Sequence, residues 1–233
     1  IAGLGMAAPL EAKCPGKRLG SIARRERLGG TWDLFRYPGI RSDSDMYPLG
    51  SEFEPWLEDV AIAGGATILD YLNRVADTRD VRQHMRFGQQ VISANWDSTA
   101  ARWTVALVDS AGNASTENAR FLFLGSGYYD YDSPHNAEIA GLAEFGGTVV
   151  HPQFWPQGLG YAGKRVVIIG SGATAVTMVP AMAETAAKVT MLQRTPGWLF
   201  NIPAKDTLAN LLSRVLPAKW AYALTRAKNV RLG

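Results

Sequence analysis

The sequence has little of the chemistry on which disulfides and metal sites depend. It contains one cysteine, Cys14, and three histidines in 233 residues. A single cysteine cannot form an intramolecular disulfide, a CxxC redox pair or a cysteine-rich zinc site, so a disulfide reductase is excluded and a reducing cytoplasm is the expected compartment. The histidines His84, His135 and His151 show no metal-binding spacing. We therefore expect no metal.

Long apolar runs and clustered charge are also missing. No apolar run reaches the roughly 20 residues that a membrane-spanning helix needs. The 24 Lys and Arg nearly balance the 21 Asp and Glu, which gives a formal charge of +3, and the basic residues are scattered along the chain. We therefore expect neither a nucleic acid nor a membrane as partner. With 47% hydrophobic and 19% charged residues, the composition is typical of a globular protein.

What the sequence does contain is a clear β-α-β unit within residues 164–194. The run "VVIIG" (166–170) is typical of a strand buried on both faces of a parallel sheet. The stretch "ATAVTMVPAMAETAAK" (173–188) predicts a helix in which Pro180 occupies a position that tolerates a kink, and "VTML" (189–192) predicts a second strand.

Between the first strand and the helix lies the pattern GxGxxA, in the context where it indicates a dinucleotide site. Gly170 permits a tight turn, Gly172 lets the backbone approach a pyrophosphate, and Ala175 allows the helix to pack closely on the strand. The helix N-terminus offers free N–H groups and a positive dipole end to the anion. The alternative is a glycine-rich turn without a ligand.

The end of the second strand indicates which dinucleotide binds. An NAD site carries an acid there for the ribose 2'-hydroxyl, whereas this strand ends in "MLQRT". Arg194 offers a cation to a 2'-phosphate and Thr195 a hydroxyl, so we predict NADP(H). The alternative is that Arg194 is a solvated surface arginine.

The remaining sequence predicts further elements upstream and downstream. Residues 66–81 predict a helix with an apolar face, and residues 85–97 and 101–109 predict an antiparallel hairpin or meander. The stretch "RFLFLGSG" (120–127) is interpreted as an apolar strand returning to the main sheet, and residues 216–233 as a helix. The apolar face of the first helix consists of Ile68, Leu69, Leu72 and Val75.

Two stretches combine glycine, aromatic and turn residues: "RLGGTWDLFRYPGIRSD" (27–43) and "FGGTVVHPQFWP" (145–156). In the first, two glycines let a backbone approach a flat ligand, and a Tyr-Pro-Gly turn presents Arg41 and Asp43. In the second, His151 lies between glycines and a Trp-Pro pair. Both stretches can also be structural loops, the second with a packed histidine, and the residues alone leave these alternatives open.

Together the two stretches resemble the fingerprints of the FAD-dependent Baeyer-Villiger monooxygenases, a family of class B flavoprotein monooxygenases. The fingerprint FxGxxxHxxxW(P/D) is matched by Phe145, Gly147, His151, Trp155 and Pro156. The fingerprint (A/G)GxWxxxx(F/Y)P(G/M)xxxD is matched by Gly29, Gly30, Trp32, Tyr37, Pro38, Gly39 and Asp43. Trp155 favours this family over the related N/S-oxygenases, whose motif ends in Tyr. "DLFRYPGIRSDSDMY" looks closest to the ethionamide-activating monooxygenases of actinobacteria, and the resemblance extends over residues 1–233.

The resemblance implies an α/β fold with two dinucleotide-binding, Rossmann-like domains and a small antiparallel β segment. In this fold the FAD domain is partial and the NADPH domain is inserted. The implied division is a partial FAD-binding domain at 1–135, a linker with the histidine fingerprint at 136–163, and an incomplete NADPH-binding domain with the start of a helical region at 164–233. Because that linker coordinates domain movement in the family, His151 is expected to be a hinge or contact residue.

The resemblance also implies the cofactors and the residues that hold them. FAD is expected at Gly3, Thr31, Trp32, Asp33, Leu34, Asp43 and Val91. The nicotinamide side of NADPH is expected at Arg41, Ser42 and Asp43, where Asp43 orients a catalytic arginine that this sequence lacks. The diphosphate and 2'-phosphate are expected at Gly170, Ser171, Gly172, Ala173, Thr174, Ala175, Val176, Arg194 and Thr195.

The implied activity is that of an NADPH-dependent flavin monooxygenase (EC 1.14.13.-). NADPH would reduce FAD, O2 would be captured as a flavin C4a-peroxide, and the peroxide would attack a ketone or a soft sulfur atom. The expected partners are therefore a small ketone or sulfur substrate and O2.

The sequence departs from the family at both ends. Gly3 aligns with the third glycine of the FAD motif GxGxxG, so the first two are missing, and the acid expected on the FAD ribose falls at Ala23. Arg24 and Arg25 cannot accept a hydrogen bond in its place, and "RLGSIARRER" lacks the expected apolar strand. We also expect truncation soon after the NADPH motif. A second hypothesis is therefore a non-catalytic NADPH-binding remnant that does not hold FAD.

Overall fold

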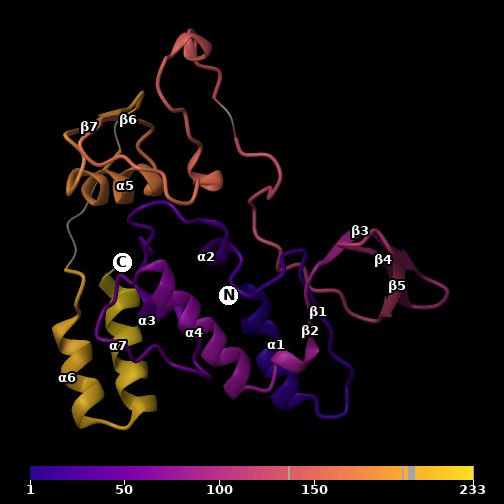
Figure 1. Ribbon diagram of the computed structural model, residues 1–233. Coiled ribbons are helices and arrows are strands. Elements are labelled where there is room, and N and C mark those ends of the chain that lie inside the picture. Colours follow the sequence, from indigo (N-terminus) through magenta and orange to yellow (C-terminus); the bar gives the residue numbers. More distant parts are fainter. Residues whose placement is uncertain (136, 196, 199–202, 233) are drawn as a thin grey trace. The chain divides into compact units, whose positions relative to one another are not determined.

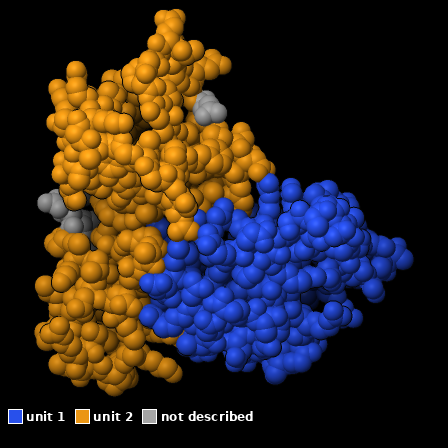
Figure 2. Space-filling view, viewed as in Figure 1, with its two compact units in different colours: residues 1–33, 69–128 blue, residues 34–68, 129–233 orange. Residues whose placement is uncertain are grey.

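The computed structural model describes residues 1–135, 137–195, 197–198 and 203–232. The chain forms two compact units, which Figure 2 distinguishes by colour. Unit 1 consists of Ile1–Asp33 and Leu69–Tyr128, and unit 2 of Leu34–Ile68 and Tyr129–Gly233. Each unit is thus built from two separate stretches of sequence. The predicted domains at 1–135, 136–163 and 164–233 are defined by the cofactor that each is expected to bind and not by compactness, and this division stays a prediction.

Unit 1 contains a helix, a short parallel pair and an antiparallel meander (Figure 1). Helix α1 (Ala2–Lys13) is followed by β1 (Ser21–Ile22). Strand β1 pairs in parallel with β2 (Met85–Arg86), which directly follows the 3-10 turn η1 (Arg82–His84). The meander consists of β3 (Gln89–Asp97), β4 (Arg102–Asp109) and β5 (Ala114–Ala119). The predicted hairpin is therefore confirmed, and β5 adds a third strand to it.

Alternating side chains hold the meander together. Trp96 and Trp103 are directly opposite each other on β3 and β4, with ring centroids 5.6 Å apart. On β4 the alternate residues Val105 and Leu107 are buried. A bulge between Val91 and Ser93 shifts the register of β3. Cross-strand aromatic and apolar contacts of this kind are the unit of sheet stabilisation.

Two sequence-based interpretations in unit 1 are wrong. Residues 121–127 form no strand, and Phe121 is 91% and Leu124 79% exposed. A strand needs a neighbour to satisfy its backbone N–H and C=O groups, and among the described residues no strand pairs with this stretch. Conversely, "RLGSIARRER" does contain a short strand, because Ser21 and Ile22 find parallel partners in Met85 and Arg86.

Unit 2 contains the predicted β-α-β unit. Strands β6 (Arg165–Ile169) and β7 (Lys188–Leu192) are parallel, and α5 (Ala173–Ala183) connects them with Pro180 inside the helix. The helix ends five residues before the predicted limit of 188. Its last turn closes there because the backbone N–H groups of Thr185 and Ala186 donate to the carbonyl of Met182.

Burial of the β6–β7 pair is one-sided, which corrects the expectation of a strand buried on both faces. Ile168 is buried in the cluster that contains α5, whereas Val167 and Ile169 are 62% and 53% exposed. On β7, Leu192 is 57% exposed. Side chains alternate between the two faces of a strand, and α5 covers one of them. Among the described residues no element covers the other.

The other regular elements in the described part of unit 2 are helices and 3-10 turns. Helix α3 (Met46–Leu49) packs on α7 (Ala218–Leu232), which in turn packs on α6 (Thr207–Val215) (Figure 1). The predicted C-terminal helix is therefore confirmed. Two 3-10 turns, η2 (Leu142–Glu144) and η3 (Pro152–Phe154), interrupt the long connection before β6.

Two helices cross the boundary between the units. Helix α2 (Thr31–Leu34) is a single turn, and α4 (Gly65–Thr78) is the predicted amphipathic helix. In α4 the side chains of Ile68, Leu72 and Val75 are buried, and Leu69 is half-buried. No helix in the described part of the chain is long and apolar enough to cross a membrane.

Candidate functional site

The loop between β6 and α5 has the geometry that a phosphate cradle requires. Gly170 adopts a φ of +124°, which side-chain-bearing residues rarely adopt, and its N–H donates to the carbonyl of Leu192 at 2.8 Å. Gly172 is the N-cap of α5 and no side chain caps the helix there. A Cβ at either glycine would meet nothing within 4 Å. The backbone of this loop therefore faces open space at an uncapped helix N-terminus.

The two residues predicted to bind the 2'-phosphate follow β7 directly. Arg194 and Thr195 are both exposed, and the carbonyl of Thr195 accepts a hydrogen bond from the Ser171 hydroxyl at 3.3 Å. This bond joins the end of β7 to the glycine loop. Among the described residues Arg194 makes no hydrogen bond or ion pair, so its guanidinium is available to an anion.

A single apolar cluster joins the glycine loop to both fingerprints. Ala175, the small residue of the GxGxxA pattern, is buried in it, as predicted for close helix packing. Phe35 and Tyr37, from the segment of the first fingerprint, are also buried there, and Trp155 of the second fingerprint packs against it. The cluster is completed by Ile168, Met178 and Met182, with Leu34, Ile40, Tyr161, Val166, Val179, Val189 and Met191 at its margin. Three motifs far apart in the sequence thus share one core.

Gly39 of the first fingerprint lies against α5. Its φ is +80°, and a Cβ there would meet the carbonyl oxygen of Thr177 and would lie 2.8 Å from the Cβ of Ala181. A side chain at this position is therefore opposed by both backbone conformation and space. The turn that carries Tyr37 and Pro38 is consequently held directly on the helix that follows the glycine loop.

His151 caps the short turn η3. Its Nδ1 accepts a hydrogen bond from the backbone N–H of Gln153 at 3.2 Å, and the Gln153 amide donates to the carbonyl of Asp130 at 2.5 Å. Trp155, which precedes Pro156, makes an edge contact with Tyr161 at 6.4 Å between ring centroids. The structure thus gives His151 a capping contact, and its role as a hinge stays a prediction.

Phe145, the first residue of the same fingerprint, is 60% exposed. Its ring lies over Gly147, where a Cβ would come within 2.6 Å of two ring atoms. The glycine of the fingerprint therefore makes room for the phenylalanine that begins it.

Residues predicted to lie along FAD are divided between the two units, with Leu34 and Asp43 in unit 2 and the others in unit 1. Thr31 and Trp32 are half-buried in α2, which ends at Leu34. Gly3 lies inside α1, where a Cβ would meet nothing within 4 Å, and Val91 is 49% exposed at the bulge of β3. Among the described residues, no contact brings these predicted FAD residues together around one ligand.

The Asp33 carboxylate forms ion pairs with two arginines. Its carboxylate is buried and paired with Arg25, whose Nε lies 3.0 Å from Oδ2, and Arg27 approaches Oδ1 at 3.3 Å. Gly29 makes this arrangement possible, because a Cβ there would lie 2.7 Å from the Cβ of Asp33. The Asp33 carboxylate therefore has its own partners without a flavin, and its backbone N–H and carbonyl are also hydrogen-bonded, to Gly30 and Arg25.

The segment predicted to face the nicotinamide is pinned by its backbone. Arg41 forms an antiparallel bridge with Gly64, and the Ser42 N–H donates to the carbonyl of Ala63 at 2.8 Å. The Ser42 side chain is buried and its hydroxyl donates to the carbonyl of Ser44 at 2.6 Å. Arg41 and Asp43 are exposed on either side of it. The fold fixes the backbone here and leaves two charged side chains accessible.

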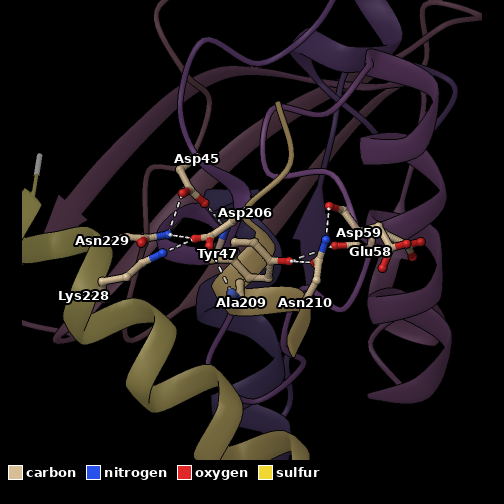
Figure 3. Close-up of polar contacts among 9 residues, drawn as sticks. All are labelled: Asp45, Tyr47, Glu58, Asp59, Asp206, Ala209, Asn210, Lys228 and Asn229. Carbon is tan, nitrogen blue, oxygen red and sulfur yellow. Dashed lines mark hydrogen bonds and ion pairs between the residues drawn. The ribbon is translucent and has the colours of Figure 1, made fainter. Parts of the chain in front are cut away.

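Sequence reasoning missed a polar cluster beside this segment, which Figure 3 shows. Asp45 accepts hydrogen bonds from the Tyr47 N–H at 2.7 Å and from the Asn229 amide at 2.6 Å. Asp206 is paired with Lys228, accepts from the Ala209 N–H, and lies 3.4 Å from the same Asn229 amide. The local signal of this cluster was the N-cap position of its two carboxylates, Asp45 before α3 and Asp206 before α6.

The pKa values of the two carboxyl groups in the cluster are shifted in opposite directions. Burial raises the pKa of Asp45, and the neighbouring Asp206 carboxylate adds to this effect. For Asp206, burial acts in the same direction, but the hydrogen bonds from Lys228 and Ala209 outweigh it and lower the pKa. Burial and the surrounding carboxylates raise the pKa of Tyr47 to about 12, which keeps its hydroxyl protonated.

The described residues contain no group of three or more His, Cys, Asp or Glu side chains arranged to hold a metal ion. The candidate site consists of the uncapped N-terminus of α5, the exposed Arg194, which has no partner among the described residues, and the segment with Arg41 and Asp43 in the same unit.

Comparison with known proteins was made on both sequence and structure. A sequence profile of the family described as flavin-binding monooxygenase-like matches residues 43–215. The FAD-containing monooxygenase EthA of Mycobacterium tuberculosis is 49% identical over 231 residues, which cover 99% of this chain and 47% of EthA. The chain thus spans about half the length of the curated relatives it matches.

Solved structures agree with the sequence match. The OTEMO complex with FAD and NADP has a TM-score of 0.69 at 32% identity, over 84% of this chain and 38% of OTEMO. An oxidised steroid monooxygenase bound to NADP has a TM-score of 0.75 at 30% identity, over 97% of this chain and 42% of that one. The predicted α/β fold class with a small antiparallel segment is therefore confirmed.

Proposed function

Because the chain belongs to the flavin-binding monooxygenase-like family, we propose that it serves an NADPH- and FAD-dependent oxygenation of Baeyer-Villiger type. The observation that carries this proposal is the uncapped N-terminus of α5 behind Gly170, with the free guanidinium of Arg194 after the adjacent strand. The substrates would be a ketone or a reduced sulfur compound and O2, and the compartment would be the cytoplasm.

The residues of the glycine loop fit the phosphates of NADPH. Gly170, Ser171 and Gly172 would bring backbone N–H groups to the diphosphate, because no side chain fills the space before them. Residues 173–176 form the first turn of α5, in which the N–H groups of residues 173–175 precede the first intrahelical bond, from Val176 to the carbonyl of Gly172. Arg194 would pair with the 2'-phosphate and Thr195 would donate its hydroxyl. Bound NADPH supplies a hydride, and the protein orients it.

We place the nicotinamide half of NADPH at Arg41, Ser42 and Asp43. Arg41 and Asp43 are exposed and of opposite charge, while buried Ser42 fixes the backbone between them. Asp43 would have an orienting role toward a catalytic arginine. The fingerprint residues Phe145, Gly147, His151, Trp155 and Pro156 would carry the contact between cofactor domains.

The residues fit FAD less completely. Thr31, Trp32, Asp33, Leu34, Asp43 and Val91 would line the flavin, and Gly3 would approach the pyrophosphate. Ala23, however, has no side-chain acceptor for the adenosine ribose, and Arg25 is occupied by Asp33. These two observations favour a second candidate function, a non-catalytic NADPH-binding unit that does not retain FAD.

One measurement separates the two functions. The purified chain is incubated with excess FAD, passed through gel filtration, and examined by visible absorption. A retained flavin band that NADPH bleaches supports the oxygenase. A colourless protein that still binds NADP+ supports the NADPH-binding unit, and a protein that binds neither contradicts both.

A further inference from the structure

The segment that carries Arg41 and Asp43 is the first part of a longer backbone ladder. Its Ser42 and Met46 N–H groups donate to the carbonyls of Ala63 and Ala61, each at 2.8 Å. The N–H of Ala61 donates in turn to the carbonyl of Ala204 at 2.8 Å. Residues 41–46, 60–64 and 204–205 therefore lie side by side, although about 140 residues separate the last two.

The polar cluster links the first and third segments of this ladder to α7 (Figure 3). Asp45 lies near the end of the first segment and is the N-cap of α3, and Asp206 follows the third segment and is the N-cap of α6. Both carboxylates turn toward α7, where the Asn229 amide donates to Asp45 and approaches Asp206. One side chain of α7 thus connects the outer two segments.

The chemistry of Asn229 suits this connection. A carboxamide has two N–H donors on one nitrogen, so it can serve two carboxylates at once. Lys228 forms its direct ion pair with Asp206, whose side chain is 13% exposed, and its charge acts on Asp45 only from a longer distance. Asp45 has no cationic partner at hydrogen-bond distance among the described residues, and the neutral amide is its contact to α7.

We propose that Asn229, acting through Asp45, is a positioning residue that sets the orientation of Arg41 and Asp43 toward the nicotinamide half of NADPH. The inference rests on the proposed NADPH site. Asp45 lies two residues after Asp43, and its side chain also caps α3 through the Tyr47 N–H. A displacement of Asp45 therefore moves the backbone that carries Asp43, while the glycine loop of α5 keeps its own contacts.

The test exchanges the two side chains of the contact between Asp45 and Asn229, first one and then both. Asn229→Asp replaces the amide by a third carboxylate beside Asp45 and should push the segment away. Adding Asp45→Asn restores an amide–carboxylate pair with reversed polarity, and asparagine still serves as an N-cap at position 45. Asn95→Asp, at an exposed position of β3, introduces the same charge change in unit 1 as a control.

Two probes separate the halves of the site. NADP+ spans the glycine loop and the proposed nicotinamide segment, whereas 2',5'-ADP reaches only the loop and Arg194. In Asn229→Asp we expect NADP+ to bind about 10-fold more weakly, the factor that corresponds to about 1.4 kcal/mol. Binding of 2',5'-ADP should change less than twofold. The double variant should regain most of the NADP+ affinity, and Asn95→Asp should bind both probes as the wild type does.

If Asn229→Asp weakens the binding of NADP+ and 2',5'-ADP equally, the residue has a merely structural role and the proposal is overturned. Unchanged affinity for both probes overturns it as well. A wild-type chain that binds NADP+ no more tightly than 2',5'-ADP overturns it as well. Failure of both probes with the wild type would instead contradict the proposed NADPH site. In that case amide hydrogen exchange at residues 41–46 decides: about 10-fold faster exchange in Asn229→Asp, reversed in the double variant, supports the positioning role, and unchanged exchange refutes it.

Discussion

Gly39 lies directly on the backbone of Thr177, so the turn of the first fingerprint and the helix of the nucleotide loop are in contact without an intervening side chain. A fingerprint residue near a cofactor site is usually interpreted as a residue that contacts the ligand. At this position the structure gives a packing reason instead, since the Thr177 carbonyl occupies the space that a Cβ on Gly39 would need.

The first prediction concerns this contact. Gly39→Ala combines positive φ with a clash against α5, so we expect a loss of about 2–5 kcal/mol in the free energy of unfolding. Gly112→Ala is the matched control, because its φ is +86° and its Cβ would meet nothing within 4 Å. Only the conformational part, about 1–2 kcal/mol, should appear there. Urea denaturation measures both, and equal losses would show that the contact with Thr177 contributes nothing.

A second prediction concerns the choice of dinucleotide. Arg194→Ala removes the free guanidinium proposed for the 2'-phosphate, so the preference for NADPH over NADH should fall about 10- to 100-fold. Arg165→Ala, at an exposed position at the start of β6, is the control and should keep the preference. Titration with both nucleotides measures the ratio. An unchanged ratio in Arg194→Ala would refute the assignment of this residue.

Acid stability should reveal the state of Asp206. A carboxyl with a lowered pKa in the folded state stabilises the fold above its unfolded pKa of about 3.9, and this contribution is lost as the pH falls through the folded pKa. Asp206→Asn keeps an N-cap but loses the pair with Lys228, so we expect about 1–2 kcal/mol lower stability at pH 7. The difference from the wild type should shrink below pH 4. A pH-independent difference in urea denaturation would contradict this assignment.

At alkaline pH the relevant group is Tyr47. Its pKa of about 12 lies above the unfolded value of about 10, so its contribution to stability is complete below pH 10 and is lost as the pH rises toward 12. Tyr47→Phe should remove one tyrosinate component with a midpoint near 12 from the ultraviolet titration. Tyr128→Phe, at a side chain 87% exposed, should leave that component in place. Its persistence in Tyr47→Phe would assign it to another residue.

The β-α-β unit was predictable because its signals are local. An apolar run, two glycines and an alanine-rich helix occupy one continuous stretch, and a short sequence window contains all of them. The same applies to the meander, whose strands follow one another directly. The apolar stretch at 120–127 carries an equally strong local signal, but a strand also requires a neighbour, and the sequence window does not contain one.

The polar cluster was not predictable for the opposite reason. Asp45 and Asn229 are 184 positions apart, and neither residue alone differs from an ordinary surface side chain in the sequence. What joins them is the packing of α3 on α7 and the pairing of residues 60–62 with 204–205. Of the candidate site, the sequence therefore indicates the phosphate loop and Arg194, while the support of the Arg41–Asp43 segment emerges only in three dimensions.

The paired indoles of Trp96 and Trp103 give the meander an optical signature of its own. Two aromatic chromophores held 5.6 Å apart and tilted by 58° couple their electronic transitions, which produces a characteristic doublet in circular dichroism. Both rings belong to unit 1, whereas Gly39, Asp206, Arg194 and Asn229 belong to unit 2. The doublet therefore reports the integrity of one unit while substitutions perturb the other, so local damage in a variant can be distinguished from collapse of the whole chain.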